Sequence, residues 1–318
     1  MGAGQANLTA NGPGPTFGVR PEHFGAAVNG LERPATPPCS VCHGSGYVLT
    51  VDGEYARARV CRCQGTCPRC GGGGYLLEMR EDGYQFYRPC SCRNLVRRVE
   101  RFNRALIPAH FTFKDLDNFE ATERTAHVLN FVRTFARGYP ADRTGLLLVG
   151  PPGVGKTHLV VGVLKVLALE KGISCLFKDF FLLLSEVKAA YEVGKFETEV
   201  LRPLTEVEVL VVDELGKGRS NSDWEHGLLD EIVCKRYNQM KTTLLTTNFP
   251  LEPPRDRSGT VLRAGVGNLA SSALIPTLEE RVGERIFSRL KQMCTILRID
   301  AADYRRAHSA RGSARPRR

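Results

Sequence analysis

The sequence predicts an α/β fold in which a parallel sheet is flanked by helices, preceded by a small module of β-hairpins. Two observations lead to this prediction. From about residue 110 onward, short apolar runs alternate with amphipathic stretches, and one of these runs opens into a glycine-rich loop. Such alternation is typical of parallel strands that are joined by helices. Ahead of this region, eight of the eleven cysteines lie between residues 39 and 92 in closely spaced pairs.

The composition fits one core of ordinary domain size with smaller modules attached. The chain has 318 residues, of which 42% are hydrophobic, and this is enough apolar material for such a core. No apolar run reaches the roughly 18 residues of a membrane-spanning helix. The first residues also lack the basic and then apolar layout of a signal peptide. We therefore expect a cytoplasmic protein that makes no use of a membrane.

The two ends of the chain differ in composition from the rest. Residues 1–38 are rich in glycine and proline, and we expect them to be disordered. The net charge is +10, but the tail at residues 305–318 carries six arginines and no acid, which leaves +4 for the remainder. Such a tail either binds phosphate or acidic protein or is simply solvated, and the sequence leaves both open.

The clustered cysteines form an internal repeat of about 28 residues. Each repeat reads CxxCxGxGY and closes with CxC about twenty residues later. Structural zinc takes four thiolates from two such pairs, whereas CxC geometry suits a disulfide poorly. We therefore predict a tandem zinc ribbon over residues 39–93, most simply with one ion per repeat, although an interleaved pairing stays open. The predicted ligands are Cys39, Cys42, Cys61, Cys63, Cys67, Cys70, Cys90 and Cys92.

Each repeat also predicts one hairpin between its cysteine pairs. The expected arms are residues 47–51 with 56–60 and residues 75–79 with 84–88, and the Asp-Gly pairs at 52–53 and 82–83 are strong signals for a two-residue turn. A basic linker helix is expected next, at residues 94–108. Leu95, Val99, Phe102 and Leu106 keep helical spacing, Asn94 is the expected N-cap, and Pro108 the end.

Residues 109–304 are predicted to form an ATPase domain. The segment GPPGVGKT matches the phosphate-binding pattern G-x-x-x-x-G-K-[ST], and it lies between a predicted strand and a predicted helix as that pattern requires. Backbone amides of such a loop surround the phosphates, Lys156 reaches the β- and γ-phosphates, and the Thr157 hydroxyl binds Mg²⁺. The predicted ATP-binding residues are Gly150, Pro151, Pro152, Gly153, Val154, Gly155, Lys156, Thr157, His158 and Asp213.

Acidic and polar residues end the next predicted strands. The segment VEVLVVDEL ends in Asp213 and Glu214, and TTLLTTN ends in Asn248. Downstream of a phosphate-binding loop, Asp213 is expected to hold Mg²⁺ and Glu214 to polarise the attacking water. A polar side chain at the end of the later strand can point toward the γ-phosphate. By itself Asn248 is a weak signal, because Thr-Asn often starts a turn.

The segment at residues 277–294 predicts one helix that carries a row of arginines. Thr277 and Glu280 form a capping box at its start. Arginines then recur at every fourth position, at Arg281, Arg285 and Arg289. Like charges in line weaken a helix slightly, so this row favours an outside anion as its partner. Pairing with a local acid such as Glu284 is the alternative.

As an ordered set, these motifs resemble the DnaC/DnaI-type replicative helicase loaders and the related IstB transposition helpers, which are AAA+ ATPases. The resemblance covers about residues 95–306, through GPPGVGKTHL, LVVDELG, TTN, GERIFSRLKQMC and DYR. It implies that Asn248 is sensor 1, that Arg289 is the arginine finger with Arg285 beside it, and that Arg305 is sensor 2. The cysteine module followed by a basic helix is similar to the part of DnaI-type loaders that grips the helicase.

Two departures from the family pattern matter for function. The cysteine unit is duplicated, and the stretch at residues 251–273 is longer than the usual link after sensor 1. That stretch is either disordered or a loop that contacts DNA or a partner, and the sequence does not choose. No aromatic-rich basic groove for single strands is visible.

The resemblance implies an ATP-dependent replication factor that loads a hexameric replicative helicase onto single-stranded DNA. ATP, Mg²⁺ and Zn²⁺ are the expected cofactors, and hydrolysis is expected to be slow and stimulated by the partner or by DNA. Because an arginine finger acts on a neighbouring subunit, self-assembly through the ATP site is expected. An IstB-like transposition helper and an ATP-switched adaptor with little turnover remain open as alternatives.

Overall fold

The computed structural model describes residues 39–141, 143–217, 222–253, 255, 263–266 and 269–304. The predicted disorder of residues 1–38 and the basic tail at 305–318, with Arg305, lie outside the described part of the chain.

A five-stranded parallel sheet forms the centre of the molecule, in the order β11-β5-β8-β7-β6. Every residue of β5, β7 and β8 is buried, as expected for a parallel sheet that is covered on both faces. The predicted α/β fold is therefore confirmed. The strands are β5 (Gly145–Val149), β6 (Cys175–Asp179), β7 (Val209–Asp213), β8 (Thr242–Thr247) and β11 (Cys294–Arg298).

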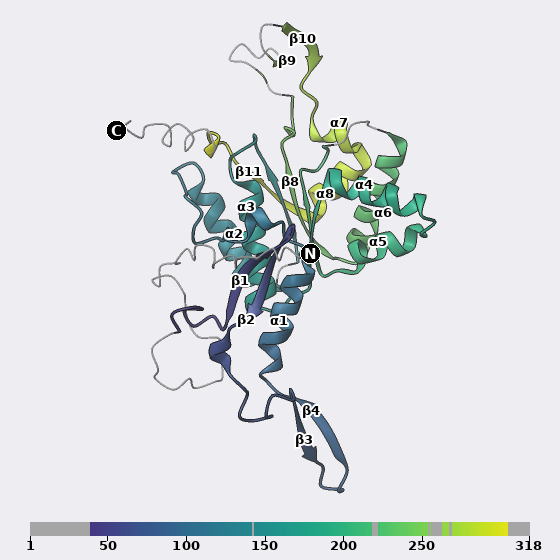
Figure 1. Cartoon of the computed structure of the whole chain (residues 1–318). Helices are drawn as coiled ribbons and strands as arrows, with labels where there is room; N and C mark the ends of the chain where they lie inside the picture. Colours follow the sequence, from purple (N-terminus) through teal and green to yellow (C-terminus); the bar gives the residue numbers. More distant parts are fainter. Residues whose placement is uncertain are drawn as a thin grey trace, which may run out of the picture.

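Two hydrophobic cores lie on opposite faces of this sheet. Successive strand residues point to opposite faces, so Leu146 and Leu148 enter one core while Leu147 and Val149 enter the other. Helices α2 and α3 cover the first face, and α4, α5, α6 and α8 cover the second (Figure 1). Their bounds are α2 (Ala126–Gly138), α3 (Lys156–Lys165), α4 (Phe180–Glu192), α5 (Glu197–Glu206), α6 (Asp223–Asn238), α7 (Leu278–Val282) and α8 (Glu284–Met293).

Both predicted hairpins form, and they share one register. β1 (Tyr47–Asp52) pairs with β2 (Tyr55–Val60), and β3 (Tyr75–Met79) pairs with β4 (Gln85–Pro89). The first turn has two residues, as the Asp-Gly signal predicted, but Gly53 and Glu54 form it, one position later than the predicted Asp52-Gly53 pair. The second turn is longer than predicted, because Met79 pairs with Gln85 and leaves a five-residue loop.

Helix α1 (Arg93–Arg104) follows the second hairpin and packs into the first of the two cores of the sheet. The prediction that Asn94 is the N-cap of this helix was wrong, because Cys92 occupies the cap position and Asn94 lies in the first turn. The helix also ends before the predicted residue 108, since Leu106 adopts a left-handed backbone with φ +55°. Val99 and Phe102 are buried in the same core as strand β5, so α1 joins the first hairpin to the domain.

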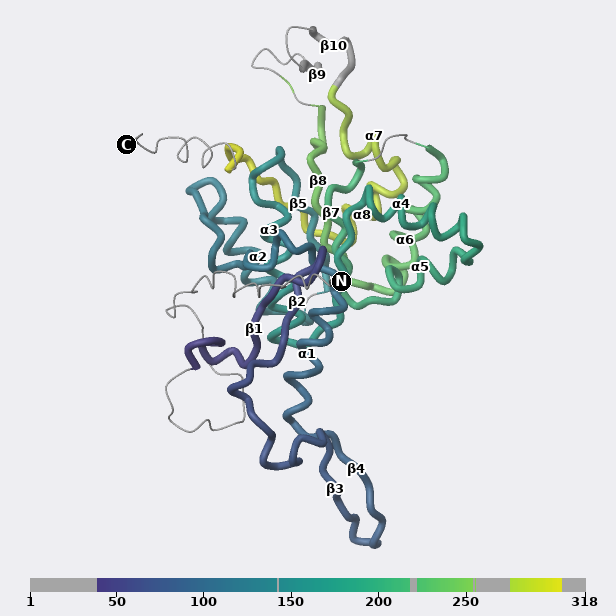
Figure 2. Tube along the Cα trace, in the orientation of Figure 1, coloured from purple at the N-terminus to yellow at the C-terminus, as the bar shows by residue number. Residues whose placement is uncertain are grey.

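The long stretch after β8 contains a second kind of hairpin. β9 (Arg263–Val266) pairs antiparallel with β10 (Leu269–Leu274), while residues 254, 256–262 and 267–268 lie outside the described part. The β3–β4 hairpin projects away from the central sheet, beside the start of α1 (Figures 1 and 2). Among the helices that the structure describes, none has the length and apolar character needed to cross a membrane.

Candidate nucleotide site and metal centres

The glycine-rich loop connects β5 to α3, and its lysine is drawn inward. Gly153 and Gly155 adopt φ angles of +82° and +94°, which side chains with a Cβ rarely take. Lys156 is buried, and its Nζ donates to the carbonyl oxygens of Gly150 at 2.7 Å and Pro151 at 2.8 Å. It also donates to Asn248 Oδ1 at 2.6 Å. The predicted phosphate-binding lysine and the predicted sensor residue therefore meet.

A second contact joins the loop to strand β7. Thr157 Oγ1 donates to the two carboxylate oxygens of Asp213 at 2.9 and 3.1 Å. Thr246 Oγ1, from β8, donates to the same carboxylate at 2.5 Å. Burial raises the pKa of Asp213 above its ordinary value. A hydroxyl and a carboxylate are oxygen ligands of the kind that Mg²⁺ prefers, so Thr157 and Asp213 are suited to hold this ion.

Glu214 directly follows β7 and makes a turn of the backbone. Its φ is +56°, and its N–H donates to Thr246 Oγ1 at 3.0 Å. Its carboxylate forms an ion pair with Lys217, and this hydrogen bond raises the pKa of Lys217. The predicted water-polarising group is thus present at the sheet edge, but its charge is engaged by a neighbouring cation.

Two functional contacts were missed at the sequence level, those of Thr246 and Lys217. Thr246 bridges Asp213 and the Glu214 amide. Its position two residues before Asn248 was an available signal, because the carboxyl ends of neighbouring parallel strands meet at one sheet edge. For Lys217 no sequence signal exists beyond its spacing of three from Glu214.

The predicted row of three arginines is wrong. The segment forms two helices, α7 and α8, because Gly283 between them has φ +85°. The capping box of Thr277 and Glu280 is present. Arg281 lies on α7, apart from the other two, and donates twice to the carbonyl oxygen of Gly216 at 2.9 and 2.8 Å.

Arg285 and Arg289 remain together on α8, and both approach Asp230 on α6. Arg289 Nη1 is 3.2 Å and Arg285 Nε is 3.6 Å from Asp230 Oδ1. This is a local acid, although on another helix than the Glu284 considered from sequence. The side chain of Arg285 is 71% exposed, against 25% for Arg289. Arg285 is therefore the more accessible of the two.

His158, predicted to bind ATP, holds a neighbouring segment against the loop. Its Nε2 is 2.7 Å from the carbonyl oxygen of Asp115 and 3.0 Å from Asn118 Oδ1. Desolvation lowers the pKa of His158, which favours the neutral ring. The Phe119 ring meets His158 edge-on and packs so closely on Gly155 that a Cβ there would lie 2.5 Å from a ring carbon. This aromatic contact was also missed.

The segment after β11 runs along the phosphate-binding loop. The Tyr304 N–H donates to the Gly153 carbonyl at 3.1 Å, and its hydroxyl is 2.7 Å from Glu120 Oε1. The DYR motif therefore begins beside the loop, while its Arg305 lies outside the described residues.

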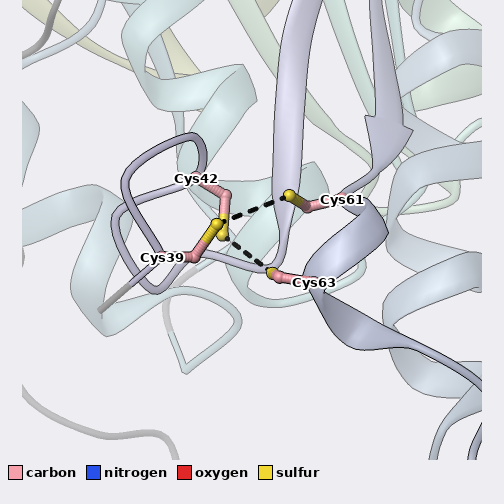
Figure 3. A group of neighbouring side chains, drawn as sticks. All are labelled: Cys39, Cys42, Cys61 and Cys63. Carbon is pink, nitrogen blue, oxygen red and sulfur yellow. Dashed lines mark hydrogen bonds between the residues drawn. The ribbon is translucent and has the colours of Figure 1, made fainter. Parts of the chain in front are cut away.

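The eight repeat cysteines gather into two groups of four, one per repeat, with the sulfurs of each group within 4.8 Å of one another. Figure 3 shows the first group, in which Cys39 and Cys61 sulfurs lie 4.0 Å apart and those of Cys42 and Cys63 lie 3.4 Å apart. In the second group, the sulfurs of Cys67 and Cys90 lie 3.8 Å apart and those of Cys70 and Cys92 lie 3.5 Å apart.

These groups fit a tetrahedral zinc centre. With Zn–S bonds of about 2.3 Å, the sulfurs of a tetrahedron are about 3.8 Å apart, whereas a disulfide bond is about 2.05 Å long. Hydrogen bonds from the backbone of Cys42 and Val41 lower the pKa of Cys39 to about 7. The Gly74 N–H donates to the Cys70 sulfur at 3.2 Å, because glycines after the cysteine pair let the chain turn tightly enough for an amide to face a thiolate. At Cys39 and Cys70 these contacts favour the thiolate form, which is the form that binds metal.

Together, the glycine-rich loop, the Thr157–Asp213 contact and the covered parallel sheet define a P-loop nucleotide-binding protein. The model of the IstB-like ATP binding protein family matches residues 89–257, which is more than half of the chain. The chain therefore belongs to the family of IstB-like ATP-binding proteins.

Similar proteins include a helicase loader and ATP-binding proteins of insertion sequences, in line with the resemblance stated from the sequence. The replicative helicase loader DnaC of Escherichia coli K12 is 26% identical over 162 residues, 50% of this chain and 65% of that protein. A putative ATP-binding protein of insertion sequence IS21 from Pseudomonas aeruginosa is 32% identical over 136 residues, 42% of this chain and 50% of that protein. The chain thus spans less than two thirds of the length of these curated relatives.

Solved structures of loaders are also similar to this chain. A crystal structure of the DnaC helicase loader has a TM-score of 0.49 and 32% identity, and the match covers 60% of this chain and 99% of that one. A crystal structure of DnaI has a TM-score of 0.45 and 20% identity, with 62% and 93% covered.

Proposed function

We propose that this chain is an AAA+ ATPase that loads a hexameric replicative helicase onto single-stranded DNA. The observation that carries the ATPase part is the convergence of Lys156, Thr157, Asp213 and Asn248 within hydrogen-bond distance at one edge of the sheet. The DnaC relative, a replicative helicase loader, supports the loader part.

Each residue of the site has a role in this proposal. The amides of residues 150–158 surround the phosphates, and Lys156 neutralises their charge. Thr157 and Asp213 hold Mg²⁺, which supplies charge stabilisation for the transferred phosphoryl group. Glu214 polarises the attacking water once its carboxylate leaves Lys217, and Asn248 contacts the γ-phosphate. His158 and Phe119 support the loop from the side of residues 115–119.

The arginines complete the site across a subunit boundary. Arg285 and Arg289 lie on a helix whose apolar side chains, Ile286 and Leu290, are buried in their own domain. Their guanidinium groups reach the γ-phosphate held by a neighbour, and such a contact stabilises transition-state charge. ATP then bridges subunits, so self-assembly follows from the same site. Arg305 acts as sensor 2.

The cysteine groups hold one Zn²⁺ each in this proposal, and the module that they form binds the helicase. The donor set of four thiols per repeat supports zinc. Binding of the helicase by this module is carried over from the resemblance to DnaI-type loaders. The extended β9–β10 segment is left without a role.

Two alternatives have observations in their favour. The insertion-sequence relatives support an IstB-like transposition helper. The ion pair between Glu214 and Lys217 supports an adaptor with little turnover, because it engages the water-polarising carboxylate. Binding to a purified replicative helicase separates the loader from the transposition helper, since only the loader recognises it.

Two substitutions test the site itself. Lys156→Ala is expected to abolish ATP binding, because the phosphates lose their counter-charge. Glu214→Gln is expected to retain ATP binding and to stop turnover, because an amide cannot take a proton from water. Equilibrium binding of a fluorescent ATP analogue and steady-state phosphate release measure the two effects. Hydrolysis by Glu214→Gln at the parent rate would make Glu214 a purely structural residue.

A further inference from the structure

The two cysteine hairpins are duplicates whose equivalent faces have different surroundings. Leu49 pairs with Ala58 across β1–β2, and at the same repeat positions Leu77 pairs with Tyr87 across β3–β4. Because the registers agree, the two hairpins present the same face at the same positions. The surroundings of this face in the first hairpin can therefore be compared directly with those of the equivalent face in the second hairpin.

In the first repeat, a helix covers the centre of this face. Ala56 and Ala58 are 1% exposed and lie in one core with Val99 and Phe102 of α1. Asn103, also on α1, accepts from the Ala58 N–H at 2.7 Å and donates to the Ala58 carbonyl at 3.0 Å. The first hairpin is thus a platform for an amphipathic helix.

In the second repeat, none of the described helices covers the same face, and the face is more apolar. Tyr75, Leu77, Met79 and Tyr87 are exposed by 47%, 56%, 67% and 72%. The hairpin projects beyond the start of α1, away from the sheet (Figure 2). Such a grouping of large apolar side chains marks an interaction site on a surface. We call these four residues the hairpin face.

The charges around the hairpin face favour protein over nucleic acid. Residues 67–93, which precede the basic side chains of α1, contain four arginines and three acids, and a zinc ion held by four thiolates would add a net charge of −2. Arg88 is already paired with Glu78 at 2.6 Å. Surfaces that stack single strands combine aromatics with a positive groove, which a nearly neutral module does not offer. Tyrosines beside aliphatic side chains are instead typical of protein interface centres.

We propose that the hairpin face docks an amphipathic helix of the partner helicase, in the way that β1–β2 docks α1. The two zinc repeats then have different functions. The first packs against the ATPase domain, and the second binds the partner helicase. Arg93 lies 4.3 Å from the centre of the Tyr75 ring, so an acidic side chain at one end of the incoming helix meets a cation. The proposal rests on the proposed loader function.

The test compares two matched variants for binding to the purified hexameric replicative helicase of the same organism. Met79→Asp places a charge in the hairpin face. Val51→Asp is the control, because Val51 occupies the equivalent position of the first hairpin and is 55% exposed. A second hairpin-face variant, the double substitution Leu77→Asp with Tyr87→Asp, removes the apolar side chains at the centre of the face. Zinc content and circular dichroism verify that each variant is folded.

The expected result is a loss of helicase affinity of at least about tenfold for both hairpin-face variants, as for interface anchors elsewhere, and less than about twofold for Val51→Asp. Equal binding by parent and hairpin-face variants would overturn the inference while the loader function stands. A parent chain that does not bind helicase at all refutes the loader function and the inference with it. Loss of single-strand binding or of self-association, with helicase affinity unchanged, would assign the face to those contacts and overturn the inference.

Discussion

The guanidinium of Arg281 donates two hydrogen bonds to the carbonyl oxygen of Gly216, at 2.9 and 2.8 Å. Gly216 lies two residues after Glu214, so this contact reaches the turn that carries the proposed water-polarising group. The same guanidinium lies 5.3 Å from the centre of the Phe249 ring. Phe249 is the residue that directly follows Asn248 in the sequence. Arg281 therefore ties the ends of β7 and β8 to α7, which continues through Gly283 into the helix of Arg285 and Arg289.

This geometry predicts that Arg281 positions the site without binding ATP. Arg281→Lys keeps the charge but loses the planar fork, so the Glu214 turn loses its support. We expect kcat to fall about tenfold, as for loss of a charged hydrogen bond, with ATP affinity changed by less than about twofold. Arg202→Lys is the control, because Arg202 makes only an exposed pair with Glu206. A parallel loss of affinity and kcat would contradict a positioning role.

The ion pair between Glu214 and Lys217 predicts a restrained basal activity. In Lys217→Gln the carboxylate loses its cationic partner and is free to orient water. Because an exposed pair contributes up to about 1 kcal/mol, basal ATP turnover is expected to rise by up to about fivefold. Lys235→Gln, which breaks the exposed Lys235–Glu231 pair on α6, is the matched control. A fall in turnover would show that Lys217 assists the reaction instead.

The parts of the site that sequence could predict are those with local signals. The loop that ends in Lys156 and Thr157 is defined by its spacing, and the buried runs before Asp213 and Asn248 mark parallel strands. Since such strands end at one sheet edge, their meeting follows from the strand order. Each repeat's cysteines are likewise brought together by a hairpin with a local turn signal.

What could not be predicted depends on packing between distant segments. Gly283 interrupts the arginine row, and the row read from spacing alone ignored the preference of glycine for positive φ. The ion pair of Lys217 and the bridge by Thr246 appear only once the strands are adjacent. The unequal burial of the two hairpins is of the same kind, because Ala58 is covered only where α1 folds back on the first repeat.

The placement of Arg285 and Arg289 predicts activity shared between subunits. Arg289→Ala and Lys156→Ala chains are each expected to be inactive, the first for lack of a finger and the second for lack of bound ATP. Mixed together, they form interfaces in which an intact loop faces an intact arginine, so part of the ATPase activity returns. Phosphate release from titrated mixtures measures this effect. Mixtures that stay inactive, although both chains bind their partner, would make Arg289 only the ion-pair partner of Asp230.

Two equivalent cysteines predict unequal contributions of the two metal centres to stability. Cys61 and Cys90 are both buried, and their N–H groups donate to Gly46 at 2.8 Å and Gly74 at 2.9 Å. Their local environments are therefore closely matched. They differ in what their hairpins touch, since the first shares a core with α1 and β5 while the second projects from the molecule.

Metal analysis is expected to give two zinc ions per parent chain. The Cys61→Ser chain and the Cys90→Ser chain are each expected to hold one. Because metal binding contributes directly to the folding of small zinc modules, loss of the first ion loosens β1–β2 and exposes the core beneath it. We expect the ATPase domain of Cys61→Ser to melt at least about 5 °C below the parent, with reduced turnover. Cys90→Ser is expected to keep the parent melting temperature and basal turnover, measured by calorimetry and phosphate release, and to lose helicase binding. Equal melting of the two variants would contradict this division of work between the repeats, and a parent chain with one zinc ion would contradict the two-centre module itself.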